Sequence, residues 1–227
     1  MSLLGEVARW FADPEHWQGP HGIPVRILEH VELSGLAVAV ALVIAAPIAL
    51  YLGHTGRGGF IAINVANIGR ALPSLALLAL GLVVAIALGL GLGFWPTMFA
   101  LVPLAIPPIM TNVYVAVREV DRDIVDAARG MGFSDAEILR KIEIPLGLPL
   151  MLAGVRTAAV NVVATATLGA LVAGGALGRF IVDGLALREF DQLFAGAVLV
   201  ALLAIVTEIT FSALERASRT PGMATVR

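Results

Sequence analysis

The polar side chains that could bind or line something are few and lie inside long apolar stretches. Asn161, Thr165 and Thr167 lie in the stretch 147–173, which also holds Arg156. Asn and Thr in membrane helices more often join helices than bind ligands, and an intramembrane Arg usually snorkels or pairs within a bundle. A pore must still be lined by something, and this stretch has the densest polar content. It is therefore the leading candidate for a pore wall, with a structural pairing expected for Arg156.

Weaker candidates for a pore lie in two other apolar stretches. Pro73 and Ser74 begin the stretch that runs to Leu92, and Asn112 lies near the end of another. Glu208 lies near the end of the last apolar stretch, where we expect it to pair with an Arg or to be exposed to water.

The chain lacks the usual constellations for catalysis or metal binding. None of its four His residues has the i, i+4 spacing of a helical metal site, and it contains no Cys. It has neither a Walker A sequence nor a Gly-x-Ser-x-Gly motif. We therefore expect no catalytic residue, no metal site and no cofactor bound by this chain.

The composition indicates a protein that crosses a membrane several times. Of its 227 residues, 59% are hydrophobic and 14% are charged, and the mean hydropathy is +0.92. Soluble domains carry about 25% charged residues. The net charge of −2 gives no reason to expect nucleic acid binding. Residues 1–27 lack the basic region and apolar core of a cleavable signal peptide.

Five stretches approach the roughly 20 apolar residues that a membrane-spanning helix needs. We expect an all-α protein with spans at about 31–53, 72–92, 96–117, 147–173 and 193–214. Pro103, Pro107 and Pro108 should make the third span irregular. Residues 176–191 are expected to form a loop or a shallow helix. The predicted domains are an interfacial segment (1–29), a transmembrane domain (30–215) and a tail (216–227).

The distribution of Lys and Arg predicts the orientation. Ten of the fifteen lie on the side of residues 118–145 and the C-terminus, four lie on the other side, and Arg156 lies within a span. Because cytoplasmic loops carry the excess of basic residues, we expect the C-terminus in the cytoplasm and the N-terminus outside.

A polar block at residues 118–145 interrupts the apolar sequence. It holds five of the fifteen Lys and Arg and seven of the seventeen Asp and Glu. So many charges cannot cross lipid cheaply, so the block must lie in water against the membrane or a partner. Its first half predicts a helix with Val120, Ile124, Ala127 and Ala128 on one apolar face, ended by Gly130 in a left-handed conformation.

The second half of the block predicts another helix. Phe133 is expected to be exposed, Ser134 and Glu137 form a capping box, and Pro145 is expected to end this short helix. Periodicity alone fits an ordinary cytoplasmic loop with amphipathic helices equally well.

The spacing within the block resembles the EAA loop of ATP-binding-cassette (ABC) importer permeases. That pattern is Glu-Ala-Ala, three residues, Gly, nine residues, Ile, any residue, Leu-Pro, and this chain departs from it only at Asp126 and Ile144. The resemblance implies a coupling loop (118–147) that docks on an ATPase subunit. The residues implied in coupling are Asp126, Ala127, Ala128, Gly130, Met131, Gly132, Phe133, Ile142, Ile144 and Pro145.

Further motifs resemble the osmoprotectant branch of these permeases, which imports glycine betaine, choline, carnitine and proline betaine. They include Ala66-Asn67, residues 72–80, 126–132, 145–149, 153–157, 164–168 and 173–178. The resemblance implies a MetI-like fold in a bacterial plasma membrane. It also implies two ATPase subunits that hold ATP and Mg²⁺, a second permease (a copy or a homologue) and an extracytoplasmic binding protein.

The aromatic residues bear on where the solute is selected. Quaternary ammonium groups are held by aromatic cages, but Trp10, Trp17 and Trp95 all fall at predicted outer surfaces. We therefore expect selection by a separate binding protein.

Two alternatives to an importer subunit are a stand-alone secondary transporter or channel, and a membrane enzyme. No repeat or midplane carboxylate supports the former, and no catalytic constellation supports the latter.

Overall fold

The computed structural model describes residues 3–60, 64 and 71–218, and every regular element among them is helical. The motif residues Ala66 and Asn67, together with Arg70, Arg219 and Arg227, lie outside this part of the chain. The shorter elements are α1 (Leu3–Ala12), η1 (Pro14–Trp17), α4 (Ser74–Ala87), α6 (Arg122–Gly130), α7 (Asp135–Ile138), η2 (Leu139–Glu143), η3 (Ala166–Val172) and α9 (Gly178–Leu187).

Four of the five expected spans correspond to helices long and apolar enough to cross a membrane. They are α2 (Ile23–Thr55), α5 (Phe94–Arg118), the continuous helical run Asp135–Val172 that contains α8 (Ile144–Thr165), and α10 (Phe190–Ala217). α2 begins eight residues before its predicted start, because Pro24 favours the first helical turn after Gly22.

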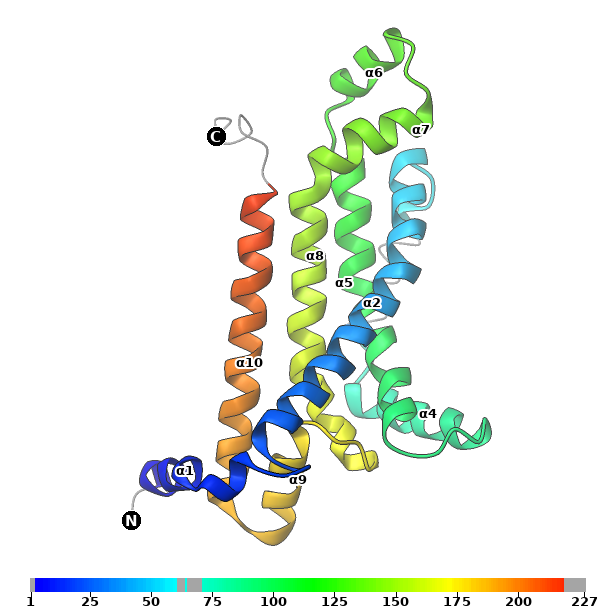
Figure 1. The fold of residues 1–227 in the computed structure, drawn as a ribbon. Coiled ribbons are helices and arrows are strands. Elements are labelled where there is room, and N and C mark those ends of the chain that lie inside the picture. Colours follow the sequence, from blue (N-terminus) through cyan, green and yellow to red (C-terminus); the bar gives the residue numbers. More distant parts are fainter. Residues whose placement is uncertain (1–2, 61–63, 65–70, 219–227) are drawn as a thin grey trace.

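The second expected span is different in the structure. α4 has 14 residues, which reach about 21 Å at 1.5 Å per residue, whereas the hydrocarbon core is about 30 Å thick. Figure 1 shows α4 lying across the end of the bundle that also holds α1 and α9. The segment ends at three glycines with positive φ, Gly89, Gly91 and Gly93.

The third span is regular where irregularity was expected. α5 runs unbroken from Phe94 to Arg118 with Pro103, Pro107 and Pro108 inside it. Prolines are tolerated in membrane helices because neighbouring helices and side chains satisfy the freed backbone groups. The Asn112 side chain adds a bond to the backbone of this helix, since it donates to the Pro108 carbonyl at 2.8 Å.

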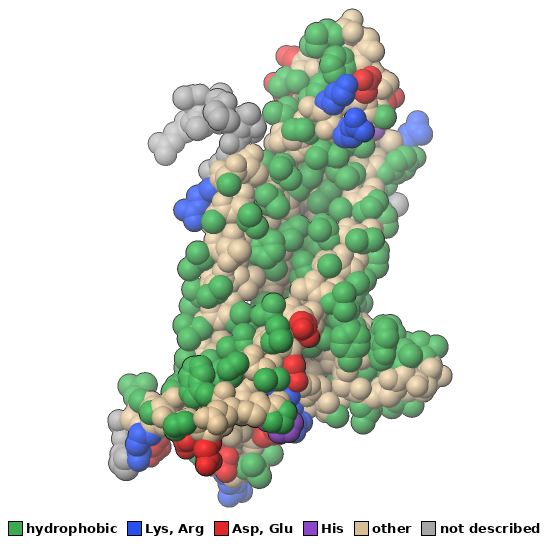
Figure 2. Space-filling model, viewed as in Figure 1, with side chains coloured by type: hydrophobic (Ala, Val, Ile, Leu, Met, Phe, Trp, Pro, Cys, Tyr) green, Lys and Arg blue, Asp and Glu red, His purple; other side chains and the backbone are tan. Residues whose placement is uncertain are grey.

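The core is formed where α2, α5 and α8 pack together through small side chains such as Ala41, Ala105 and Ala158, all fully buried. Such residues allow the backbones of membrane helices to approach closely. A second cluster, around Trp10, Leu177 and Ala195, fastens α1 and α9 to α10. Figure 2 shows the charged side chains gathered mainly at the two ends of the molecule.

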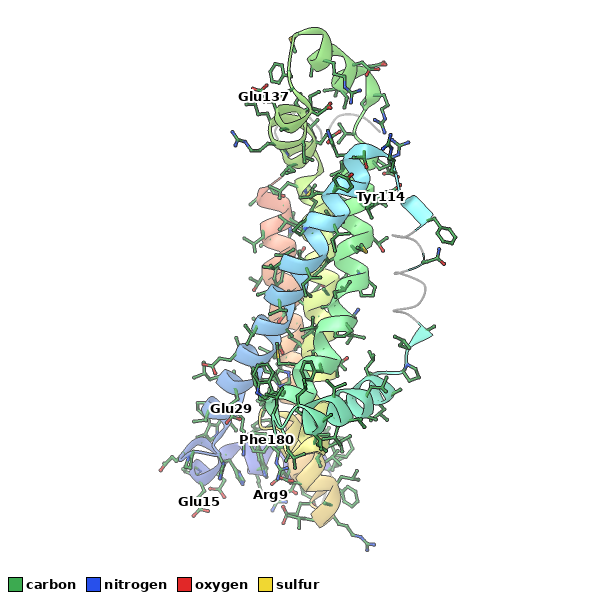
Figure 3. All side chains as sticks on the ribbon, turned by 90° about the vertical axis from the view of Figure 1, so that its right-hand side faces the viewer. Arg9, Glu15, Glu29, Tyr114, Glu137 and Phe180 are labelled. Atoms are coloured by element: carbon green, nitrogen blue, oxygen red, sulfur yellow. The ribbon has the colours of Figure 1, made fainter. Side chains whose placement is uncertain are left out.

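The polar segment (residues 118–147) projects beyond the helix bundle. Figure 1 shows α6 and α7 at the end where α10 finishes, opposite α1 and α9, and Figure 3 shows Glu137 and Tyr114 far from Glu29 and Phe180. The segment has a small core of its own, built on Val120, Val125, Ala128 and Ile138.

Candidate functional site

The turn inside the polar segment is built on Gly132 and not, as predicted, on Gly130. Gly130 is the last residue of α6, whereas Gly132 has φ +88°. The Phe133 N–H donates to the Ala128 carbonyl and the Gly132 N–H to the Arg129 carbonyl. These two bonds form a Schellman motif, in which the C′ position takes the left-handed conformation.

The apolar face of α6 is also different from the predicted one. Val125 and Ala128 are buried, while Ile124 and Ala127 face outward. Phe133, which was expected to be exposed, packs partly buried on the same small core. The Schellman turn explains this arrangement, because it commonly brings the residue after the glycine against the last turn of the helix.

Ile124, Ala127 and Met131 form an exposed apolar stripe along α6 at i, i+3 and i+7 spacing. Ile124 is 45% exposed and Met131 70%. Among the residues expected to act in coupling, Asp126 and Gly130 flank this stripe. Ile142 and Ile144 are half-buried at the base of the segment, and Pro145 is exposed. The outward face of α6 therefore offers a docking partner an exposed apolar surface.

The capping box predicted at the start of α7 is confirmed. The Ser134 side chain accepts from the Glu137 N–H, and the Glu137 carboxylate accepts from the Ser134 N–H at 3.1 Å. The Glu137 carboxylate also accepts from Lys141 Nζ at 2.8 Å. This ammonium group and the two Ser134 donors lower the pKa of Glu137 from its usual 4.5 to about 2.

We expect this cap to open in acid. Because the folded pKa of Glu137 lies below its ordinary value, its contribution to α7 is complete above about pH 4.5 and is lost as the pH falls toward 2. Hydrogen exchange of the amides at 134–138, corrected for intrinsic rates, should show protection falling in that window. A Glu137→Gln variant keeps the hydrogen-bonding side chain without titrating; an identical pH profile in the two proteins would contradict the assignment.

Pro145 does not end the second helix, contrary to the prediction. Residues 135–172 form one helical run, and Pro145 lies in the first turn of α8. The preceding stretch is a π-helix in which the Ile144 N–H donates to the Leu139 carbonyl. A proline removes one N–H from the hydrogen-bond ladder of a continuous helix, and here it directly follows the π-turn, where that ladder is already irregular. The polar segment is therefore joined to α8 without a loop.

A second feature is a cavity of about 430 Å³ between α4, α5 and α8. Four of the six residues predicted to line a pore meet around it: Ser74, Asn112, Asn161 and Thr165. Pro73, which caps α4, and Thr167, which donates to the Ala164 carbonyl, are not among its lining residues.

The cavity also includes two polar residues that the sequence did not single out. Thr157 lies four residues before Asn161 on α8, so helical spacing would have found it. Thr111 could not be found in this way, because its place depends on how α5 packs. Its Oγ1 is buried and has no hydrogen-bond partner among the described residues. Among the described residues, the cavity lining contains hydroxyl and amide groups but no charged side chain.

Arg156 pairs with α10, which confirms the structural role expected for it. Its guanidinium donates to Glu208 at 3.1 Å and lies 3.5 Å from Glu215. This network fastens α8 to α10, and Arg156 is not among the described residues that line the cavity.

Comparison with known proteins identifies the family. The model described as "Binding-protein-dependent transport system inner membrane component" matches residues 34–220. The chain belongs to this family. Together with the curated relatives described next, this match confirms the resemblance drawn from the EAA-like spacing and the osmoprotectant motifs.

The curated relatives are similar over most of their lengths. The choline transport system permease protein OpuBB of Bacillus subtilis is 34% identical over 195 residues, which cover 86% of this chain and 88% of the relative. The glycine betaine/carnitine/choline transport system permease protein OpuCB of the same organism is 33% identical over the same shares. The osmoprotectant import permease protein OsmY of Salmonella typhimurium is 32% identical over 79% of this chain and 75% of its own length.

A solved structure agrees with the predicted fold. A chain of the inward-facing MetNI methionine ABC transporter superposes with a TM-score of 0.73 at 21% identity, over 85% of this chain and 94% of that one. The all-α, MetI-like permease fold expected from the sequence is therefore confirmed.

Proposed function

We propose that this chain is a permease subunit of an ABC importer and forms half of the path for a compatible solute such as glycine betaine, choline or carnitine. The observation that carries the proposal is the family match over residues 34–220, together with relatives named as permeases for these solutes. A stand-alone transporter or channel is disfavoured by the same match.

The cavity between α4, α5 and α8 is the proposed path. Its hydroxyl and amide groups can replace part of the hydration of a passing solute, and no charged side chain among the lining residues that the structure describes would hold the solute tightly. Ser74, Asn112, Asn161 and Thr165 are its proposed contacts, with Pro73 and Thr167 at its margins. Glycines bring the helices that form the cavity into close contact. Small shifts of one helix against another would therefore alter the shape of the cavity.

The polar segment is the proposed coupling element. Its exposed stripe of Ile124, Ala127 and Met131 would dock on one of two ATPase subunits, which hold ATP and Mg²⁺. In this arrangement the segment and the C-terminus are cytoplasmic and the N-terminus is outside, in a bacterial plasma membrane. A second permease, identical or homologous, completes the path, and an extracytoplasmic binding protein delivers the solute.

Reconstitution in liposomes tests this function. The chain, together with the ATPase, the partner permease if there is one, and the binding protein from neighbouring reading frames, should accumulate labelled glycine betaine or choline only when ATP is supplied. The chain by itself should neither conduct nor exchange these solutes. Solute exchange by the isolated chain would instead support the stand-alone transporter.

A substitution in the cavity tests the path. Asn161→Phe places a ring in the lining, and we expect uptake to fall by roughly tenfold or more, as steric exclusion by added groups can produce. Leu202→Phe introduces the same ring on α10, at a position that is 53% exposed, and uptake should be retained. Equal uptake by the two variants at equal amounts of inserted protein would argue against this cavity as the path.

A further inference from the structure

A buried carboxylate lies at the base of the polar segment. Glu143 is the last residue of the π-helix and is only 2% exposed. Its Oε2 accepts a hydrogen bond from Nδ1 of His54 at 2.6 Å. His54 lies in the last turn of α2, 89 residues away in the sequence. The bond therefore joins the segment to a helix that is distant from it in the sequence.

The helix ends around this bond are closely packed. A Cβ at Gly53 would come within 2.9 Å of Val117 Cβ, and one at Gly147 within 2.8 Å of the Ala116 carbonyl oxygen. The ends of α2 and α8 thus both press on the end of α5. Backbones in such close contact have little room to slide independently, so a displacement at one is passed to its neighbours.

The hydrogen bond between Glu143 and His54 is expected to be a strong one. An ionised carboxylate removed from water is costly unless it is hydrogen-bonded, and hydrogen bonds to charged acceptors are among the shorter and stronger ones in proteins. His54 supplies such a bond from α2. The π-helix that carries Glu143 is itself unusual, because π-turns occur mostly as single turns and often at functional sites.

We propose that the Glu143–His54 hydrogen bond is a second transmission contact, which passes movement of the polar segment to α2 in addition to the continuous helix through Pro145 into α8. Glu143 and His54 are positioning residues in this role, since they would touch neither ATP nor solute. The proposal rests on the proposed function of the polar segment as the coupling element.

Five variants of the complete reconstituted complex test this. Glu143→Leu and His54→Leu remove the bond singly, and the double variant removes both partners. Glu143→Gln and His54→Asn are conservative, because Gln can still accept and the Asn Nδ2 can occupy the place of His Nδ1. The quantities measured are solute taken up per ATP hydrolysed, the amount of assembled complex and its melting temperature.

We expect uptake per ATP to fall by about 2- to 30-fold in both single Leu variants, the range that substitutions along coupled networks produce. The conservative variants should remain close to the wild type. The double variant is decisive. Replacing both partners of a buried polar pair by apolar groups can be nearly neutral for stability, so assembly and melting temperature should recover while uptake per ATP stays low.

Two outcomes would overturn the inference. One is a double variant whose uptake per ATP returns to the wild-type value, which would make the pair a purely structural contact. The other is wild-type coupling in Glu143→Leu. Absence of ATP-driven uptake in the wild-type complex would be a different result, since it would overturn the proposed function itself.

Discussion

A Gly154→Ala variant should lose much of its thermal stability and its uptake. Gly154 lies where α8 crosses α5, and an added Cβ would come within 2.5 Å of Asn112 Cβ and 2.9 Å of the Pro108 carbonyl oxygen. Neither atom is the end of a flexible side chain, so the helices must separate. Overpacking of this kind typically costs about 1–3 kcal/mol.

The effect on transport should exceed the effect of lower stability alone. Pro108 and Asn112 both line the cavity between α4, α5 and α8. Separation of α5 from α8 at this point would displace the Asn112 amide from the proposed path. We therefore expect reduced uptake even at a temperature where the variant is fully folded.

Gly35→Ala is the matched control for this prediction. Gly35 is also a glycine within a spanning helix, α2, but nothing lies within 4 Å of an added Cβ there. The same methyl group should be neutral or slightly stabilising, because Ala is the better helix former by about 1 kcal/mol. The measurements are the melting temperature in detergent and ATP-driven uptake. Equal melting temperatures for the two variants would contradict the close packing of α5 on α8.

The second large effect is expected at Gly132. A Gly132→Val variant has space for its side chain, since nothing lies within 4 Å of an added Cβ, but φ is +88° there. A left-handed conformation costs a non-glycine residue about 1–2 kcal/mol, and a β-branched residue is an outlier there. The Schellman turn should therefore open, and α6 should lose its angle to α7.

The readout for Gly132→Val is ATP-driven uptake at equal amounts of inserted protein. A cost of 1–2 kcal/mol shifts the equilibrium constant between the native and the opened turn by about 5- to 30-fold, so uptake should fall by up to that factor. Gly130→Ala places a methyl group in equally open space on a helical residue, and it should retain most of its uptake. Normal uptake by Gly132→Val would count strongly against a coupling role for this segment.

Gly130 and Gly132 show how much of the polar segment could be predicted from the sequence. The spacing from Asp126 to Pro145 identified the family, and the capping box at Ser134 and Glu137 was predicted correctly because its bonds join residues three apart. Either glycine could have ended α6 on sequence grounds. In the structure the turn lies at Gly132, and Phe133 packs on the small core next to it. That core includes Ile138 from the next helix, so it is not a local feature of α6.

The cavity was predictable only in part. Asn161 and Thr165 share one face of α8 by helical spacing, so the sequence could mark them as neighbours. Ser74 and Asn112 join them only because α4 and α5 converge on α8. The second span was mispredicted for a related reason. Hydropathy measures how apolar a stretch is and says nothing of how long its helix is or how it lies. α4 is a 14-residue helix that lies across the end of the bundle.

The sequence by itself determined the class of protein, the position of the polar segment and its capping box, because each depends on composition or on residues a few positions apart. The tertiary structure alone decided the face of α6 that is exposed, the residues that share the cavity and the bond between Glu143 and His54. These depend on the packing of helices that are distant in the sequence. No local pattern marks such contacts, because a buried carboxylate and its partner are brought together only when the helices that carry them fold against one another.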